Sequence, residues 1–229
     1  MRRCLGELKN TFYFNTCGQV NTEKTLQLAI QRARKLKIKK LVVASETGLS
    51  ALKAAEMLQK TGIALIVVTS AAGTVINNTA IGNLKIGIAD KRIYEKLVQN
   101  DAQIVRGTDP LHNIGAALER RGIPTIATLA RICLGMISSG TTVCVTATMM
   151  ATDNGLLKEG EETVAVAGSW VGLDTAIVIR AANSVNFLAN NANIEIREVI
   201  CKPRKPTHSW PVNQKDWVGN LKPYKKFTQ

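Results

Sequence analysis

The sequence predicts an α/β fold in which helices pack on a mostly parallel β-sheet, and three observations support this. Short apolar runs rich in β-branched residues alternate with amphipathic helical patterns along most of the 229 residues. Two of these runs end in polar turns that contain glycine, as strands beside a ligand site often do. The two strands at 164–167 and 174–180 are joined by a gap too short for a crossover helix, so they must pair antiparallel.

The first clear strand comprises residues 41–44, and a helical pattern begins five residues later. The turn between them offers the hydroxyl groups of Ser45, Thr47 and Ser50, and Gly48 permits a positive φ. The unpaired amides at the start of the helix point back at this turn, which therefore predicts a site for a phosphate group. The alternative is that Thr47 or Ser50 only caps the helix.

The other elements of the amino-terminal half follow from the same patterns. In chain order they are a lead-in segment with an aromatic patch at 12–14, an amphipathic helix at 22–37, a helix ending near 60, a strand at 63–68, a long loop at 71–83, a helix from Asp90 and a short strand at 104–105.

Residues 111–160 are predicted to be mainly helical, after a helix start at Asp109-Pro110 and with breaks at 122–124 and near Gly140. The β-branched residues 141–146 favour a strand, whereas the residues that follow favour a helix, so the pattern leaves this choice open. The second glycine-bearing turn, 168–172, separates the two antiparallel strands, and residues 194–200 are a candidate edge strand.

The composition is that of a soluble globular protein of one domain, since 45% of the residues are apolar and 21% are charged. No stretch approaches the roughly 18 uninterrupted apolar residues of a membrane span. The first residues lack the apolar core of a secretory signal. Five scattered cysteines favour a reducing compartment, and none has the spacing of zinc ligands. We therefore expect a cytoplasmic protein with no membrane partner and no metal site.

The formal charge of +13 is concentrated in two segments. Residues 22–40 contain seven Lys or Arg and one Glu, and residues 202–229 contain seven Lys or Arg and one Asp, so each has a net charge of +6. Such surfaces attract nucleic acid or other polyanions. The alternative, which we favour from the sequence alone, is a solvated helix face and a basic tail, because neither segment has a nucleic-acid-binding motif.

Residues 21–180 resemble the carboxyl-terminal domain of pyruvate kinase, here without the catalytic barrel. Residues 45–51, Ser-Glu-Thr-Gly-Leu-Ser-Ala, are similar to the phosphate-holding turn of that domain, and Gly168-Ser169-Trp170 is similar to its effector loop. The closer resemblance is to stand-alone archaeal and bacterial proteins of this fold. It is carried by residues 21–26, 42–45, 51–56, 150–156 and 174–176 and covers about three quarters of the chain.

The resemblance implies a three-layer α/β/α architecture whose five-stranded, mostly parallel sheet has the order 3-2-1-4-5, with the last strand antiparallel. It also implies that residues 141–155 form a helix. Strands one and four are then neighbours, so the two glycine-bearing turns face each other across one crevice. We expect a pyruvate kinase C-terminal-like domain at 1–201 and a basic tail at 202–229, anchored by Trp210 and Trp217.

Members of the stand-alone group hold flavin mononucleotide (FMN) while their reaction is unassigned, so the resemblance implies FMN and leaves open whether the protein is an enzyme. By position, Ser45, Thr47, Gly48 and Ser50 would hold the phosphate, Gly168, Ser169, Trp170 and Gly172 would close the other side, and Thr69 and Ser70 would lie at the rim. The chain departs from these relatives in lacking a His after Thr69, a Gly-Thr-Gly-like turn at 168–170 and an acidic residue near Thr146.

Several single residues have two interpretations. Trp170 either stacks on a ligand or packs as a lid on its own loop. His112 is a candidate acid or base, although a single His at a helix start is more often a surface residue. Asp153 and Asp174 are expected to shape a helix end and a turn rather than to form a working carboxylate pair. Glu46 brings negative charge close to the phosphate site, and the sequence does not decide whether its side chain points outward.

The leading hypothesis is a protein that binds a phosphorylated small molecule, most specifically FMN. The alternatives are a non-catalytic effector-sensing module for a sugar phosphate or nucleotide, and nucleic-acid binding through the basic helix and tail. The sequence is compatible with a homo-oligomer. A Gly48→Asp substitution is expected to abolish binding of the phosphorylated ligand and to leave the protein folded.

Overall fold

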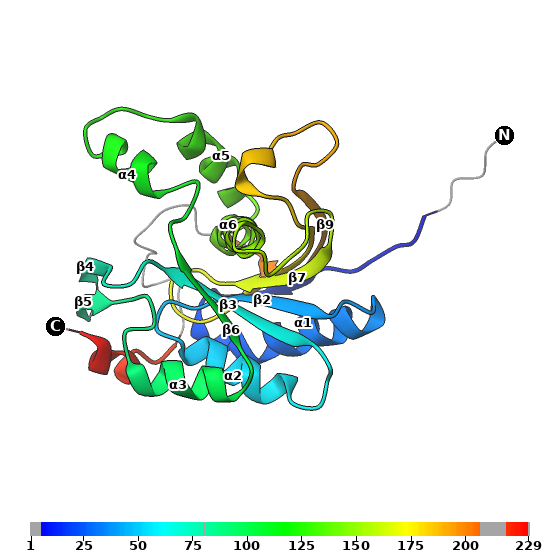
Figure 1. Ribbon diagram of the computed structural model, residues 1–229, viewed down its shortest axis with the longest axis horizontal. Helices are drawn as coiled ribbons and strands as arrows, with labels where there is room; N and C mark the ends of the chain where they lie inside the picture. The colour runs from blue at the N-terminus through cyan, green and yellow to red at the C-terminus, as the bar shows by residue number, and fades with distance from the viewer. Residues whose placement is uncertain (1–5, 80, 207–218, 229) are drawn as a thin grey trace.

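The computed structural model describes residues 6–79, 81–206 and 219–228 and contains a seven-stranded sheet in the order β1-β9-β8-β7-β2-β3-β6 (Figure 1). The strands are β1 (Phe12–Phe14), β2 (Lys40–Ala44), β3 (Ala64–Ser70), β6 (Gln103–Gly107), β7 (Glu162–Ala167), β8 (Thr175–Arg180) and β9 (Glu195–Pro203). A separate hairpin is formed by β4 (Val75–Thr79) and β5 (Gly82–Lys85).

Helices cover both faces of the sheet, with α1, α2 and α3 on one face and α6 on the other, while α4 and α5 pack beyond α6 (Figure 1). The helices are α1 (Thr22–Lys35), α2 (Leu49–Leu58), α3 (Lys91–Gln99), α4 (Asn113–Glu119), α5 (Ile126–Gly135) and α6 (Ser139–Asp153). Three short 3₁₀ segments, η1 (Gln19–Asn21), η2 (Ser184–Asn186) and η3 (Lys222–Phe227), complete the described elements.

The side chains of each central strand alternate between two apolar cores. On β2, Leu41 and Val43 face the core beneath α1 and α2, whereas Val42 faces the core beneath α6. The same alternation holds on β3, β7 and β8. A strand buried on both faces needs apolar residues at every position, which explains the continuous apolar runs in the sequence.

The predicted order of the five central strands is confirmed, because β6, β3, β2, β7 and β8 are consecutive neighbours and β8 runs antiparallel to β7. The count of five is wrong, since β9 and β1 extend the sheet beyond β8. The candidate edge strand at 194–200 corresponds to β9, but the edge itself is β1, which pairs parallel with β9. A three-residue strand carries too little periodicity to be recognised in the sequence.

The helix implied by the resemblance at 141–155 is confirmed by α6. This helix is buried along most of its length, so packing decides its structure against the β propensity of its Thr and Val residues. The Thr148 hydroxyl donates to the Cys144 carbonyl oxygen (2.8 Å) and the Thr152 hydroxyl to the Thr148 carbonyl oxygen (2.8 Å). These bonds satisfy hydroxyl groups that the apolar surroundings would otherwise leave unpaired.

Two local predictions are wrong. The expected loop at 71–83 contains the β4–β5 hairpin, whose strands pair antiparallel with an irregular register between Ile76 and Thr79. The helix expected from Asp109-Pro110 begins later, at Asn113, with His112 as its N-cap residue. Asp109 instead closes a turn, since its Oδ1 accepts a 2.8 Å hydrogen bond from the Leu111 amide.

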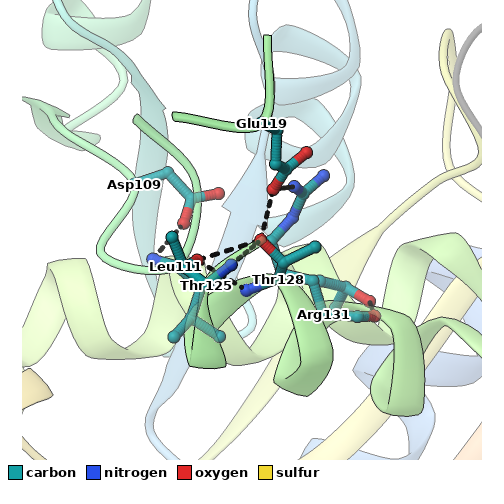
Figure 2. Close-up of polar contacts among 7 residues, drawn as sticks. Asp109, Leu111, Glu119, Thr125, Thr128 and Arg131 are labelled. Carbon is teal, nitrogen blue, oxygen red and sulfur yellow. Dashed lines mark hydrogen bonds and ion pairs between the residues drawn. The ribbon is translucent and has the colours of Figure 1, made fainter. Parts of the chain in front are cut away.

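Polar side chains connect α4 with α5, as Figure 2 shows. Thr125 caps α5 by accepting a hydrogen bond from the Thr128 amide (3.2 Å). The Thr128 hydroxyl donates to the Glu119 carboxylate at the end of α4, and Arg131 lies 3.8 Å from the same carboxylate. Glu119 therefore serves the packing of these two helices.

Candidate functional site

The turn after β2 enters α2 through Gly48, which is the N-cap residue and has a φ of 86°. Because glycine has no capping side chain, Ser45 supplies the contact: its Oγ accepts a 3.3 Å hydrogen bond from the Ala51 amide. The Ser45 amide donates to the Val68 carbonyl oxygen on β3 (2.9 Å). These bonds attach the turn to the sheet and hold the start of α2 in place.

Four consecutive backbone amides, from Thr47 to Ser50, have no hydrogen-bond acceptor within the described residues. They lie at the N-terminus of the ten-residue α2, where the helix dipole adds partial positive charge. The Thr47 hydroxyl also makes no hydrogen bond to any described residue. The turn thus retains the donors that an anion requires, with no Lys or Arg among its residues.

The Glu46 side chain, whose direction the sequence left open, is held by the end of β3. Its Oε2 accepts hydrogen bonds from the Thr69 hydroxyl (2.9 Å) and the Ser70 amide (3.1 Å), and its Oε1 accepts one from the Ser70 hydroxyl (2.7 Å). The carboxylate is therefore balanced by donors at the end of β3 and makes no hydrogen bond to the turn amides. Thr69 and Ser70, which we placed at the rim of the ligand site, are engaged by a side chain of the protein.

Gly48 packs directly against the segment that leads into α3. A Cβ atom at this position would lie 2.4 Å from Cγ2 of Ile93 and 3.3 Å from Cγ2 of Ile88. Real Cβ contacts are not that short, so any side chain here would displace the core around α3. The expectation that Gly48→Asp leaves the fold intact conflicts with this packing.

The second turn, Gly168–Gly172, lies at the same edge of the sheet as the first because β7 pairs parallel with β2. It is folded tightly: a Cβ atom at Gly168 would lie 2.1 Å from the Gly172 carbonyl oxygen, and one at Gly172 would lie 2.3 Å from the Gln19 Cα. Trp170 has a φ of 91° and packs, partly buried, against the core beneath α1 and α2. Stacking of Trp170 on a ligand stays a prediction.

Asp174 organises the second turn, as the sequence predicted. Its Oδ2 accepts hydrogen bonds from the amides of Gly18 (2.9 Å) and Ser169 (3.2 Å), and its Oδ1 accepts one from the Thr175 hydroxyl (3.1 Å). The residue is fully buried. Burial raises the pKa of this carboxyl group, and the hydrogen bonds from Gly18, Ser169 and Thr175 oppose that rise without cancelling it.

This raised pKa predicts a specific dependence of stability on pH. Consider pH values between the pKa of Asp174 in the unfolded protein and its higher pKa in the folded protein. In this window the folded protein binds more protons than the unfolded protein does. The stabilisation that Asp174 contributes is therefore lost as the pH rises through the folded pKa. We expect the free energy of unfolding of the wild type, relative to Asp174→Asn, to fall with increasing pH in this window. Urea titrations of both proteins across the acid range measure the difference, and a rising difference would contradict the assignment.

Tyr224, which sequence reasoning missed, connects the two turns. Its side chain is 4% exposed and hydrogen-bonds with Ser50 of the first turn and with Gln19, which packs on Gly172 of the second. Burial raises the pKa of Tyr224 to about 12, and the hydrogen bonds with Ser50 and Gln19 act in the opposite direction. The Asn220 amide donates to Gln19 Oε1 (2.7 Å), which attaches the same segment a second time.

Tyr224 and Phe227 are both buried in the core beneath α2 and α3. In the sequence, the only signal for this contact is that these two aromatic residues lie three positions apart in an otherwise polar stretch. The expected anchors Trp210 and Trp217 lie outside the described residues.

The family model for the pyruvate kinase α/β domain matches residues 23–179. The chain belongs to this family. Both glycine-bearing turns and the central β2–β7 pair lie inside the matched region of the pyruvate kinase α/β domain, whereas β1, β9 and η3 lie outside it. Tyr224 therefore reaches the two turns from a part of the chain that the family match does not include.

The other candidates from the sequence have structural explanations. His112 is exposed as a residue, but neighbouring chain partly withdraws its imidazole from solvent, which lowers its pKa, and the Arg131 charge lowers it further. Glu119, a nearby carboxylate, is engaged by Thr128 and Arg131. Asp153 accepts a 2.9 Å hydrogen bond from the Ser184 amide at the end of α6. These contacts support packing of the helices.

The described cysteines do not have the environment of nucleophiles. Cys17, Cys144 and Cys201 are buried and Cys133 is exposed. Burial raises the pKa of Cys144 well above its usual value and that of Cys201 to about 12, so both stay protonated thiols. No three His, Cys, Asp or Glu side chains come together as metal ligands in the described residues. Over the same ranges, no helix has both the length and the apolar character needed to cross a membrane.

Proposed function

We propose that this pyruvate kinase α/β-domain protein is a cytoplasmic protein that binds a phosphorylated small molecule, with the phosphate held by the turn after β2. The observation that supports the proposal best is the run of four amides from Thr47 to Ser50 without acceptors in the described chain. A phosphate oxygen accepts several such bonds at once, and the N-terminus of α2 adds favourable charge. The carboxylate of Glu46 is hydrogen-bonded by Thr69 and Ser70 and makes no hydrogen bond to the turn amides.

FMN is the ligand that we propose, since the resemblance to the stand-alone proteins of this fold implies it. When bound, FMN would supply redox chemistry of its flavin ring. Thr47, Gly48 and Ser50 would hold its phosphate, and Gly168, Ser169, Trp170 and Gly172 would lie on the side of the ring. Ser45 would act by holding the start of α2, because its Oγ is bonded to the Ala51 amide.

Native mass spectrometry of the purified protein tests the ligand directly. We expect a copurified mass equal to that of FMN and a yellow preparation. A colourless protein that FMN does not stabilise, but whose melting temperature rises with fructose bisphosphate or a nucleotide, would contradict FMN and support the effector-sensing alternative. A protein that is stabilised by none of these phosphorylated compounds would contradict the phosphate site itself.

A Thr47→Val substitution tests the turn without changing side-chain shape. The Thr47 hydroxyl is free within the described chain, so its loss should leave the fold unchanged and remove one donor to the phosphate. A hydrogen bond to a charged group contributes roughly 1.5–3 kcal/mol, so we expect the affinity for FMN to fall by about tenfold or more in calorimetric titrations.

The matched control is Thr74→Val, which removes a hydroxyl from an exposed position before β4. We expect this variant to bind FMN as the wild type does. Equal affinities for Thr47→Val and the wild type would exclude the Thr47 hydroxyl from the site.

A further inference from the structure

The side of α5 that faces solvent is apolar. Ile126, Leu129, Ile132 and Met136, the C-cap residue, are between 58% and 84% exposed, and Cys133 is exposed among them. Steps of three or four positions connect these residues, so they lie on one face of the helix. A surface helix normally directs charged and polar residues to solvent, and α5 departs from that pattern. The surface defined by these five residues is called the α5 face below.

The other two sides of α5 are in contact with the rest of the chain. One side packs on the core beneath α6 through Ala127, Ala130 and Leu134. On the second side, Thr128 and Arg131 contact Glu119 of α4 (Figure 2). Arg131 is the only charged residue of α5, and its charge is directed to α4. The α5 face is therefore the side that the described residues leave largely uncovered, and it contains no charged residue.

The α5 face is large enough for a weak but specific contact with another protein surface. Four large apolar side chains exposed to this degree present on the order of 350 Å² of apolar area, which is the size of the largest patch on many monomers. Flanking side chains are covered as well when two helices pack, so a pair of such faces would bury on the order of 1,000 Å² in total. Contacts of that size are reversible rather than obligate.

We propose that a second copy of this chain covers the α5 face, through antiparallel packing of α5 on α5 about a two-fold axis. Ile126, Leu129, Cys133 and Met136 follow one another in steps of three, four and three, which is the spacing of a helix–helix seam. Antiparallel pairing centred on position 131 places Leu129 opposite Cys133 of the second copy and Ile126 opposite Met136. A large side chain then meets a small one across the axis, so the row is complementary to itself.

Charge also favours a second copy over a membrane surface. Helices that lie on membranes have Lys and Arg beside their apolar face, whereas the one cation of α5 is paired with Glu119 on the α4 side. For the same reason, contact between two copies brings no unpaired cation of α5 against its own equivalent. The net charge of +13 on each copy still opposes association at long range, so we expect salt to strengthen the dimer. Binding to an anionic membrane would instead weaken with salt.

Sedimentation velocity of the full-length protein, at concentrations from about 1 to 200 µM, tests the proposal. We expect monomers at the low end and dimers at the high end, with a dissociation constant on the order of 10–100 µM. The dissociation constant should fall as salt increases. This association is a property beyond the binding of a phosphorylated small molecule, and it involves a helix on the face of the sheet opposite α2 (Figure 1).

A Leu129→Lys substitution tests the α5 face itself. Leu129 is exposed and lysine is a good helix former, so the fold should be unchanged. We expect the association to weaken by about tenfold or more, because the two-fold axis brings two new positive charges together in an apolar contact. The matched control is Val98→Lys on α3, which is 51% exposed and lies on the other face of the sheet. This variant should associate as the wild type does, and circular dichroism melts should show that both variants are folded.

Cys133 reports the direction of the two helices. Antiparallel pairing centred on position 131 separates the two Cys133 residues by about 6 Å along the helix axis, because each lies two residues from the centre at a rise of 1.5 Å per residue. A short bismaleimide should therefore cross-link two copies of the wild type. The cross-link should be lost in Cys133→Ser and in Leu129→Lys.

A protein that stays monomeric at every concentration would overturn the proposal, and so would a Leu129→Lys variant that associates as the wild type does. Equal losses in Leu129→Lys and Val98→Lys would attribute the association to net charge rather than to the α5 face. A cross-link that persists in Cys133→Ser would contradict the antiparallel contact. A monomer that co-sediments with phosphatidylserine–phosphatidylcholine vesicles would assign the face to a membrane instead. None of these measurements involves FMN, so the phosphate site and the α5 face succeed or fail separately.

Discussion

Gly48→Asp is expected to destabilise the protein by on the order of 4–6 kcal/mol, which is a large part of the stability of a typical domain. The new Cβ would meet Ile93 at 2.4 Å, and an L-residue would have to adopt a φ of 86°. Overpacking costs about 1–3 kcal/mol and the left-handed backbone about 1–2 kcal/mol. The carboxylate would also enter an apolar wall of Ile88, Ile93 and Leu97, where an unpaired charge costs several kcal/mol more.

Thermal unfolding measures this effect, and we expect the melting temperature to fall by roughly 10–20 °C. Gly62→Asp is the matched control, because Gly62 has a φ of 70° but no atom lies within 4 Å of the position that a Cβ would take there. The control should cost only about 1 kcal/mol, which is the cost of the left-handed backbone conformation alone. Equal losses in the two variants would show that the contact with α3 is not what constrains Gly48. Gly48→Asp is therefore unsuitable as a test of ligand binding, and Thr47→Val replaces it.

Asp174→Ala is expected to have the second-largest effect, with a loss of about 3–5 kcal/mol in the free energy of unfolding. The substitution leaves the amides of Gly18 and Ser169 without their acceptor, and each buried unsatisfied group costs about 1–3 kcal/mol. The Thr175 hydroxyl loses one partner as well, although it lies 3.0 Å from the Ser138 hydroxyl and keeps that contact. Urea denaturation of the variant and the wild type gives the difference.

The Asp174→Asn variant keeps the size of the side chain and can keep its hydrogen bonds, whereas Asp174→Ala loses both. An asparagine can place its carbonyl oxygen toward Gly18 and Ser169 and its amide group toward the Thr175 oxygen, so we expect a cost of only about 1 kcal/mol. If Asp174→Asn destabilised the protein as much as Asp174→Ala, the two amides would not be the reason that Asp174 is needed. The same pair of variants then reports on the second turn alone, since Asp174 contacts Gly18, Ser169 and Thr175 but not the turn after β2.

Much of the fold could be predicted from the sequence because the central strands contain continuous buried apolar runs and helices between them are amphipathic. Where the prediction failed, the signal was weak. The β4–β5 hairpin has polar residues on short strands and looks like a loop. The helical state of α6 contradicts local propensity and depends on its burial between the sheet and α5, which only tertiary structure or a family resemblance can provide.

The candidate site was predicted where it is local and missed where it is not. Ser45, Thr47, Gly48 and Ser50 are adjacent in sequence, so their turn could be identified directly. The bonds of Glu46 to Thr69 and Ser70 depend on the pairing of β2 with β3, which aligns Ala44 with Val68. Tyr224 reaches Ser50 from the far end of the chain, and no pattern of spacing relates two residues so distant in sequence.

The parallel pairing of β1 with β9 has a consequence for synthesis of the protein. During synthesis, Phe12, Tyr13 and Phe14 leave the ribosome long before their partners, Cys201 to Pro203, which come among the last residues of the sheet. Pairs so distant in sequence form slowly, and unpaired aromatic strands promote association between chains in the meantime. Lys24, which follows these rings closely in the chain and lies over the Phe12 ring in the folded protein, would add a positive charge that repels other copies during that interval. Natural sequences use such charges to protect strands that are exposed.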